Sequence, residues 1–222
     1  MDIEVTGHDD VRVLTWNDGE NRINHDSLAR LNERLDEIDA IDIGVRVAVV
    51  MTGRGKFFCN GLDLGRFAPF SDEYESTFSE LQRTIGRILV LPAYTVAAIN
   101  GHAFAGGALL ACAFDHRVMR EDRGYWCVNE VEIGLALNEG MWSILANRVP
   151  RATATHAALT AHRFAGPEAM ASGIVDAVAS EHEVLNVALA VAQAATALDR
   201  KAIRYQKRVI HGAEAKHLGF VF

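Results

Sequence analysis

The sequence predicts an α/β fold on a mainly parallel sheet, from one repeated pattern and one bulk property. Segments 45–88 and 94–114 each run from a short apolar stretch, through a loop with glycines, into a helical stretch. Such alternation is typical of crossover units, whose loops lie at strand ends and are available to ligands. The chain has 222 residues, 50% of them hydrophobic, so it can fill one large core.

The N-terminal region predicts a hairpin followed by a helix. Apolar stretches 3–5 and 11–16 flank a polar turn at 7–10, as two antiparallel strands would. After a loop rich in turn residues, Asp26 is the expected N-cap of a helix. Apolar residues then recur at spacings of three and four over 28–38, which is the pattern of one buried helical face.

Two strand, loop and helix units form the predicted centre of the fold. Stretch 45–51 is rich in β-branched residues and leads into the glycine-containing loop 52–64. An amphipathic helix over 78–88 follows this loop. The second unit begins with the apolar strand 94–99 and ends with a small, apolar helix at 108–114. The sequence therefore places two glycine loops at equivalent points of two consecutive units.

The C-terminal half predicts mostly helices. Two further short strands are expected at 125–128 and 174–178. Helices are expected at 141–149, 152–159, 167–171, 183–198 and 202–210.

Composition and cysteine usage exclude several classes of protein. The formal net charge is −7, and the sequence has no basic run, so no nucleic-acid partner is indicated. Cys59, Cys112 and Cys127 form no C-x-x-C pair, which argues against a disulfide framework and a zinc site. No apolar run has the length of a membrane span. We therefore expect a reduced, cytoplasmic protein without a metal site or a membrane partner.

The stretch 99–115 is the strongest candidate for a functional element. Gly101, Gly106 and Gly107 lie between a predicted strand and a predicted helix, where free amides at the helix start favour negative charge. Such amides can form an oxyanion site. A tight turn that only packs the helix on the sheet explains a lone Gly-Gly better. Phosphate binding fits poorly, because the pattern G-x-x-x-x-G-K-[ST] is missing.

A second and a third segment raise the oxyanion interpretation. Segments 55–64, 100–115 and 130–134 resemble the three signatures of the crotonase (enoyl-CoA hydratase/isomerase) superfamily, in its order and at its intervals. Segment 165–176 is similar to a further stretch of that family. The resemblance covers nearly the whole chain and is closest to the Δ3-Δ2-enoyl-CoA isomerases.

The resemblance implies a fold, an assembly and a substrate. The fold would be the crotonase (ClpP/crotonase-like) spiral of ββα units. Residues 1–150 would form the core with the acyl-CoA site, and the helical region 151–222 would form trimers and cover the pocket. The substrate would be an acyl-CoA thioester, and no cofactor is expected because coenzyme A is part of the substrate. A homotrimer or hexamer is the expected assembly.

The resemblance also assigns catalytic roles residue by residue. The backbone amides of Leu62 and Gly106 would form the oxyanion hole for the thioester oxygen. Glu130 would be the acid-base residue, four residues before Gly134. Hydratases of this family have a second glutamate where this sequence has Leu109. Moving a double bond needs one base, whereas adding water uses two carboxylates, so the resemblance favours a Δ3-Δ2-enoyl-CoA isomerase.

Two alternatives stay open from the sequence alone. The first is another crotonase reaction on an acyl-CoA, such as hydration, thioester hydrolysis or decarboxylation. Glu139 or Glu132 would then serve as an auxiliary acid, although Glu132 shares a face with Glu130 only if its segment is extended. The second alternative is an acyl-CoA binder without enzymatic activity that has kept the oxyanion loops.

An acidic protein must meet the phosphates of coenzyme A with local cations. Arg22, Arg54 and Lys56 lie on the two loops that the family uses for the nucleotide end. Backbone groups over Leu62, Asp63 and Leu64 are a further expected contact, with the adenine. The side chain of Asp63 is expected to cap the following helix.

Overall fold

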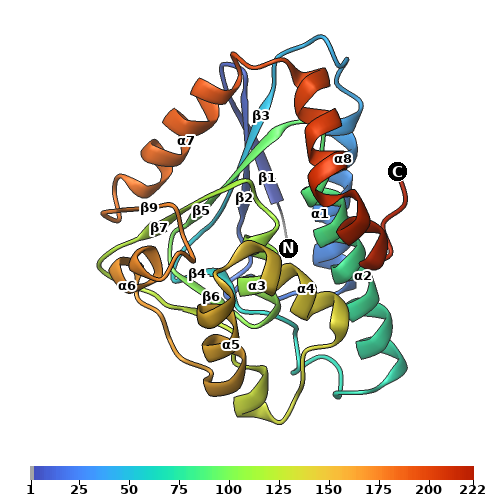
Figure 1. Cartoon of the computed structure of the whole chain (residues 1–222), viewed down its shortest axis with the longest axis vertical. Helices are drawn as coiled ribbons and strands as arrows, with labels where there is room; N and C mark the ends of the chain where they lie inside the picture. Colours follow the sequence, from blue (N-terminus) through green and yellow to red (C-terminus); the bar gives the residue numbers. More distant parts are fainter. Residues whose placement is uncertain (1–2) are drawn as a thin grey trace.

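The computed structural model describes residues 3–222 and contains a six-stranded sheet and a smaller three-stranded one (Figure 1). The larger sheet has the order β1-β2-β3-β5-β7-β9, and only β1 and β2 pair in antiparallel fashion. These strands are β1 (Ile3–His8), β2 (Val11–Trp16), β3 (Ala48–Gly53), β5 (Tyr94–Ile99), β7 (His116–Arg120) and β9 (Ala177–Ala179). The predicted N-terminal hairpin and mainly parallel sheet are therefore confirmed.

The smaller sheet holds the second strand of each repeating unit. Its strands, in the order β4-β6-β8, are β4 (Phe57–Cys59), β6 (His102–Phe104) and β8 (Trp126–Cys127). Along the chain, two strands and a helix follow one another three times, since α1, α2 and α3 each come after a pair of strands. A fourth pair, β7 and β8, is followed by the 3-10 helix η1 (Glu130–Ile133). This order is the expected spiral of ββα units.

Eight α-helices lie in the described residues. They are α1 (His25–Asp39), α2 (Asp72–Leu89), α3 (Gly106–Cys112), α4 (Glu139–Arg148), α5 (Arg151–Thr160), α6 (Gly166–Ala171), α7 (Val184–Ala195) and α8 (Arg200–His217). Figure 1 shows α7 on one side of the larger sheet and α1, α2 and α8 on the other. None of the helices in residues 3–222 is long and apolar enough to cross a membrane.

Strand alternation divides the apolar side chains between two cores. In β3, Ala48 and Val50 belong to a small core beneath α7, whereas Val49 and Met51 belong to the main core on the opposite face. Both faces of β3 are buried, which explains why its sequence is a continuous apolar run and not an alternating one. The sheet therefore lies between two helical layers.

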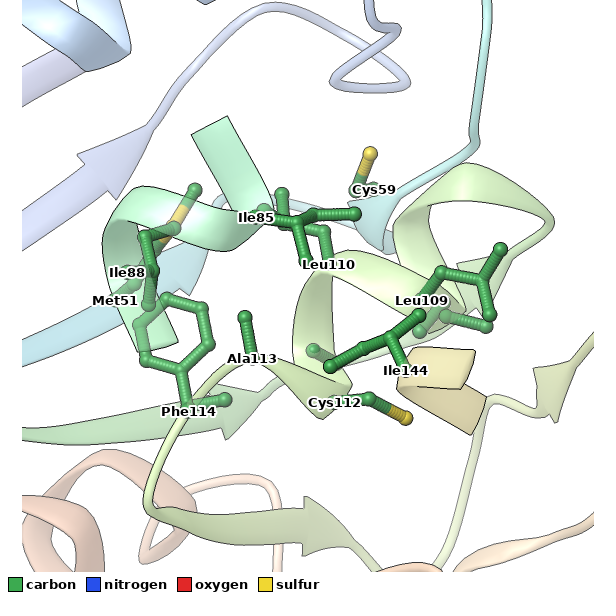
Figure 2. Packing of buried hydrophobic residues seen from close by; sticks show 14 of the residues in the cluster. Met51, Cys59, Ile85, Ile88, Leu109, Leu110, Cys112, Ala113, Phe114 and Ile144 are labelled. Carbon is green, nitrogen blue, oxygen red and sulfur yellow. The ribbon is translucent and has the colours of Figure 1, made fainter. Parts of the chain in front are cut away.

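Helix α3 is the central element of the main core. All of its residues from Gly106 to Cys112 are buried. Figure 2 shows its Leu109 and Leu110 among Ile85 and Ile88 of α2 and Ile144 of α4. Its last carbonyls, of Cys112 and Phe114, accept hydrogen bonds from Arg148 at 2.9 and 2.6 Å. Packing on every side fixes the direction of α3, and hence the place of its N-terminus.

Several predicted boundaries move in the structure. Helix α1 is capped by Asn24 and not by Asp26, because Asn24 and Ser27 exchange side-chain and backbone hydrogen bonds in a capping box. The expectation that Asp63 caps the next helix is wrong, since α2 begins at Asp72 with Ser71 as its N-cap. Strand β3 begins at Ala48, because Val45 lies in a turn with 49% of its surface exposed.

Residues beyond 150 contribute to the sheet as well as to helices. The strand expected at 174–178 is found as β9, slightly later, and it pairs in parallel with β7. Helix α7 then covers the sheet, and α8 runs seven residues further than the predicted end at 210, against α2. Trimer formation and pocket cover by the region 151–222 stay predictions.

Candidate active site

A cavity of about 210 Å³ lies where α2, α3, η1 and the loop after β4 meet. Its wall contains four residues that the sequence analysis selected from separate segments, namely Leu62, Gly106, Leu109 and Glu130. Most of the remaining wall is apolar and comes from α2 and from residues 133–137. The fold therefore brings the three signature segments to one place.

The two glycine turns touch each other at this cavity. A Cβ atom placed on Gly61 would lie 3.4 Å from the amide nitrogen of Gly106 and 2.9 Å from the Cβ of Ala105. A Cβ atom placed on Gly107 would lie only 2.3 Å from the carbonyl oxygen of Cys59. Glycine is required at both positions, because any side chain would push the turns apart.

The backbone around Leu62 leaves its amide on the cavity side of the chain. The flanking groups bond to Ile23, since the Ile23 amide donates to Gly61 O at 2.8 Å and the Asp63 amide donates to Ile23 O at 2.9 Å. In a parallel bridge the residue between these two groups directs its own N–H and C=O the other way. Gly106 is the first residue of α3, so its amide has no acceptor within the helix.

Ala105 holds the second turn in a strained conformation. Its φ of +48° and ψ of −124° are unusual for a residue with a side chain. The hydrogen bond from its amide to Cys127 O, at 2.9 Å, fixes it against β8. This conformation turns the chain sharply from β6 into α3, so that the helix N-terminus opens beside the cavity.

Glu130 is the first residue of η1 and lies in the cavity wall. Its Oε2 atom is buried and has no hydrogen-bond partner among residues 3–222. Burial raises the pKa of Glu130 to about 7, partly opposed by a hydrogen bond from its own backbone. The carboxyl group can therefore exchange a proton near neutral pH.

Leu109 stands where the family resemblance places the second carboxylate of hydratases. Its side chain is 1% exposed and lines the same cavity as Glu130. Glu130 is the only carboxylate in the lining that the described residues form. A dry leucine surface also contributes to the burial that raises the pKa of Glu130.

The structure brings together some of the residues expected to hold coenzyme A. Arg22 and Leu64 line the cavity beside Leu62. The carboxylate of Glu20 holds Arg22, with Arg22 Nε donating to it at 2.8 Å, and also accepts from Asn60 at 2.9 Å. Arg22 is thus a cation fixed at the wall of the site.

Other predicted contacts lie outside the lining of the cavity. Arg54 is exposed and pairs with Glu4 at 2.8 Å, and Lys56 is exposed on the β3–β4 turn. Asp63 is half-buried, but only its neighbours Leu62 and Leu64 line the cavity. These positions follow from the turn after β3, which directs Arg54 towards the N-terminal hairpin.

The two auxiliary carboxylates are directed elsewhere. Segment 130–133 is a 3-10 helix and not a strand, so a residue two positions after Glu130 points to another side. Glu132 is accordingly exposed and pairs with Arg163 at 3.1 Å. Glu139 is the exposed first residue of α4, outside the cavity lining. The structure therefore gives neither residue a place beside Glu130.

Helix α2 supplies wall residues that the sequence analysis missed. Tyr74, Phe78 and Leu81 line the cavity from this helix. The signal was present, because Tyr74 extends the apolar spacing of Phe78, Leu81 and Ile85 by one helical turn towards the N-terminus. Asn129, next to Glu130, also lines the cavity, and its Oδ1 atom is buried without a partner among residues 3–222.

Comparison with known proteins gives one family throughout. A family model described as enoyl-CoA hydratase/isomerase matches residues 8–218. An Arabidopsis thaliana protein named peroxisomal enoyl-CoA delta isomerase 2 is 31% identical over 182 residues, which cover 78% of this chain and 75% of that protein. A putative enoyl-CoA hydratase of Thermus thermophilus is 38% identical over 196 residues, covering 84% and 74% of the two chains.

A solved structure extends the similarity to three dimensions. The human mitochondrial delta3-delta2-enoyl-CoA isomerase superimposes with a TM-score of 0.90 at 26% identity, covering 99% of this chain and 86% of the human one. Names of both isomerases and hydratases thus occur among the similar proteins. Peroxisomal and mitochondrial proteins are among them, so the expected cytoplasmic location stays a prediction.

Proposed function

The chain belongs to the enoyl-CoA hydratase/isomerase family and has the crotonase fold, and we propose that it is a Δ3-Δ2-enoyl-CoA isomerase. One observation supports this choice above all others. Glu130, the only carboxylate lining the cavity in the described residues, shares that cavity with Leu62 and Gly106 and faces Leu109 in place of a second carboxylate. A single base beside an oxyanion site is the equipment that double-bond transposition needs.

The proposed reaction begins with the thioester oxygen between the amides of Leu62 and Gly106. Glu130 as a carboxylate removes a proton from C2, and the electron pair moves into a dienolate whose negative charge rests on the thioester oxygen. Two amides fixed in advance stabilise this charge more than the neutral thioester, with about 2.7–4 kcal/mol for a single donor in comparable sites. A proton then returns at C4, which leaves the double bond at C2.

The same wall disfavours hydration, the other activity named among the relatives. Adding water needs a group to hold and deprotonate it beside the substrate, and hydratases of the family use two carboxylates. Leu109 supplies no hydrogen bond at that place, and Glu132 and Glu139 are exposed elsewhere. The chain thus has one acid-base carboxylate where a hydratase has two.

The coenzyme A part of the substrate would enter past Arg22. This guanidinium lies at the cavity wall and is oriented by Glu20, so it can meet a phosphate while its partner keeps it in place. A homotrimer or hexamer is the assembly that we propose by family resemblance. Coenzyme A leaves with the product, so the proposal requires no resident cofactor.

Two substrates distinguish the proposed activity from its alternatives. The protein is incubated with a 3-enoyl-CoA and, separately, with the matching 2-enoyl-CoA, and formation or loss of the conjugated thioester is followed by absorbance. We expect conjugation of the 3-enoyl-CoA and no hydration of the 2-enoyl-CoA. Hydration of the 2-enoyl-CoA without conjugation of the other substrate would favour a hydratase, and binding without turnover would favour a non-enzymatic acyl-CoA binder.

A further inference from the structure

Tyr74 is a second proton-bearing side chain in the cavity that the proposed reaction does not use. It lies in the first turn of α2, is 7% exposed, and lines the same cavity as Glu130. Its backbone amide donates to Ser71 Oγ, and its hydroxyl has no hydrogen-bond partner among residues 3–222. The only other polar side chains of the described lining are Arg22, Asn60 and Asn129, which do not exchange protons near neutral pH.

Aromatic packing fixes the Tyr74 ring. It stacks on Phe78 with a centroid distance of 5.9 Å and an interplanar angle of 6°. Phe67 contacts it edge-on at 6.2 Å, and Phe70 lies 5.8 Å away. A ring held by three aromatic neighbours has few rotamers to choose from, so its hydroxyl keeps one position.

The electrostatics of Tyr74 and Glu130 suit proton exchange between them. Burial raises the pKa of Tyr74, and the nearby charges of Glu75 and then Glu130 raise it further. Tyr74 therefore stays protonated at neutral pH and can donate. The pKa of about 7 at Glu130 is lower, so a protonated Glu130 can return a proton to the Tyr74 oxygen as Tyr74 gives up its own.

We infer that the Tyr74 hydroxyl relays the proton from Glu130 to C4 of the substrate, an inference that rests on the proposed isomerase function. Glu130 takes the C2 proton, and the electron pair moves into the dienolate. As the dienolate collapses, C4 takes the proton of the Tyr74 hydroxyl, and the oxygen of Tyr74 takes the proton held by Glu130. Both side chains return to their starting states, and no other reactant is consumed.

The relay answers a geometric demand of the reaction. The proton must leave from C2 and arrive two carbons further along the chain. Glu130 is the first residue of the short helix η1, and Gly134 closes that helix, so its carboxyl group has a fixed base. A second donor on α2, across the cavity, serves C4 without movement of Glu130. Tyr74 would thus be a catalytic residue and not only part of the wall.

The test is a single-turnover label experiment with a 3-enoyl-CoA carrying deuterium at C2, in ordinary water, with enzyme in excess. The relay delivers the hydroxyl hydrogen of Tyr74 to C4, so the wild-type product carries mainly hydrogen there. In Tyr74→Phe, Glu130 must transfer the deuterium itself, so the product retains more deuterium at C4. We also expect kcat to fall by about 100-fold, at the low end for general acid-base catalysis.

Tyr205→Phe is the matched control, because Tyr205 is 68% exposed on α8 and the same hydroxyl is removed far from the cavity. Binding of a saturated acyl-CoA to both variants reports whether the cavity is intact. The relay is contradicted if Tyr74→Phe gives the same C4 label as the wild type, or the same kcat. Absence of conjugation by the wild type would instead overturn the isomerase proposal, which keeps the two failures apart.

Discussion

Glu130 combines burial with a free carboxyl oxygen, and these two properties set its pH dependence. Its pKa, raised to about 7 by burial, means that the carboxylate needed to remove the C2 proton is the minor form in acid. We expect kcat/KM to rise with pH and level off above an apparent pKa near 7, as measured by the rate of conjugation across the pH range. A profile that stays flat down to pH 5 would contradict this role for Glu130.

The same residue should make stability depend on pH. In the unfolded chain Glu130 titrates near 4.5, whereas in the folded chain it titrates at about 7, so the folded state binds the proton more tightly. Its contribution is therefore fully present in acid and is lost as pH rises towards 7. The difference corresponds to about 3 kcal/mol. We expect Glu130→Gln to be more stable than the wild type in urea at pH 8, and the advantage to vanish near pH 4.5.

Individual site residues were predictable where the motif fixes the backbone. Leu62, Gly106 and Glu130 lie in one cavity because each follows a strand or turn that its own segment specifies. Arg54 and Glu132 were not predictable, because each has an ion-pair partner from a distant segment, Glu4 and Arg163. Spacing along the sequence does not show which partner a surface charge will find.

At the scale of elements, the turn between β6 and α3 stores strain that a glycine would relieve. Ala105 adopts φ +48° and ψ −124°, which costs about 1–3 kcal/mol for a residue with a side chain. Glycine loses more freedom on folding, by about 0.5–1 kcal/mol, so the strain relief outweighs that loss. We expect Ala105→Gly to raise the free energy of unfolding by about 1 kcal/mol.

The control for this substitution is the same chemical change in a regular helix. Ala29 is exposed in α1, where a glycine should lower the free energy of unfolding by about 1 kcal/mol. Opposite signs for the two variants in urea denaturation support strain at Ala105. Destabilisation of both would show that the methyl group of Ala105 contributes more in contact with the neighbouring turn than the backbone strain costs.

Element types were predicted better than element ends. The apolar spacing identified α1 and α2 because it reflects burial, which tertiary packing confirms. Their ends depend on capping hydrogen bonds, and at the start of α1 both Asn24 and Asp26 are suitable caps. Only the reciprocal bond with Ser27 decides for Asn24, and the position of that side chain cannot be known before the loop is folded.

At the scale of the whole molecule, one buried ion pair fastens the C-terminal helix to the sheet. Lys207 of α8 lies 2.8 Å from the carboxylate of Asp115 and also donates to the carbonyl of Ala93 at 3.2 Å. Thr95 donates twice to the same Asp115 oxygen, at 2.9 Å from both its amide and its hydroxyl. The pair thus joins α8 to the start of β5 and the end of the α3 segment.

Removing one member of this pair should destabilise the fold. Lys207→Ala leaves a buried carboxylate without its cation, which typically costs about 3–5 kcal/mol. We expect a loss of about 3 kcal/mol in urea unfolding, because the two Thr95 hydrogen bonds remain. Lys201→Ala, at an exposed position of the same helix, should change stability little. Equal effects of the two substitutions would contradict the account of the buried pair.

The layered architecture was predictable because parallel crossover units leave a strong pattern in the sequence. Strand β3 reads as a continuous apolar run because α7 covers one of its faces and the main core covers the other. The identity of the helix above each face was not predictable, since α7 lies far from β3 in the sequence. Such pairing depends on long-range packing, which periodicity does not encode.

Substitution of Glu130 by glutamine tests the central claim most directly. Glutamine keeps the size and polarity of the side chain but cannot accept the C2 proton. Conversion of a 3-enoyl-CoA to its conjugated isomer is followed by absorbance, together with binding of a saturated acyl-CoA. We predict that conjugation falls by at least about 100-fold while binding persists. Conjugation at the wild-type rate in Glu130→Gln would contradict the account.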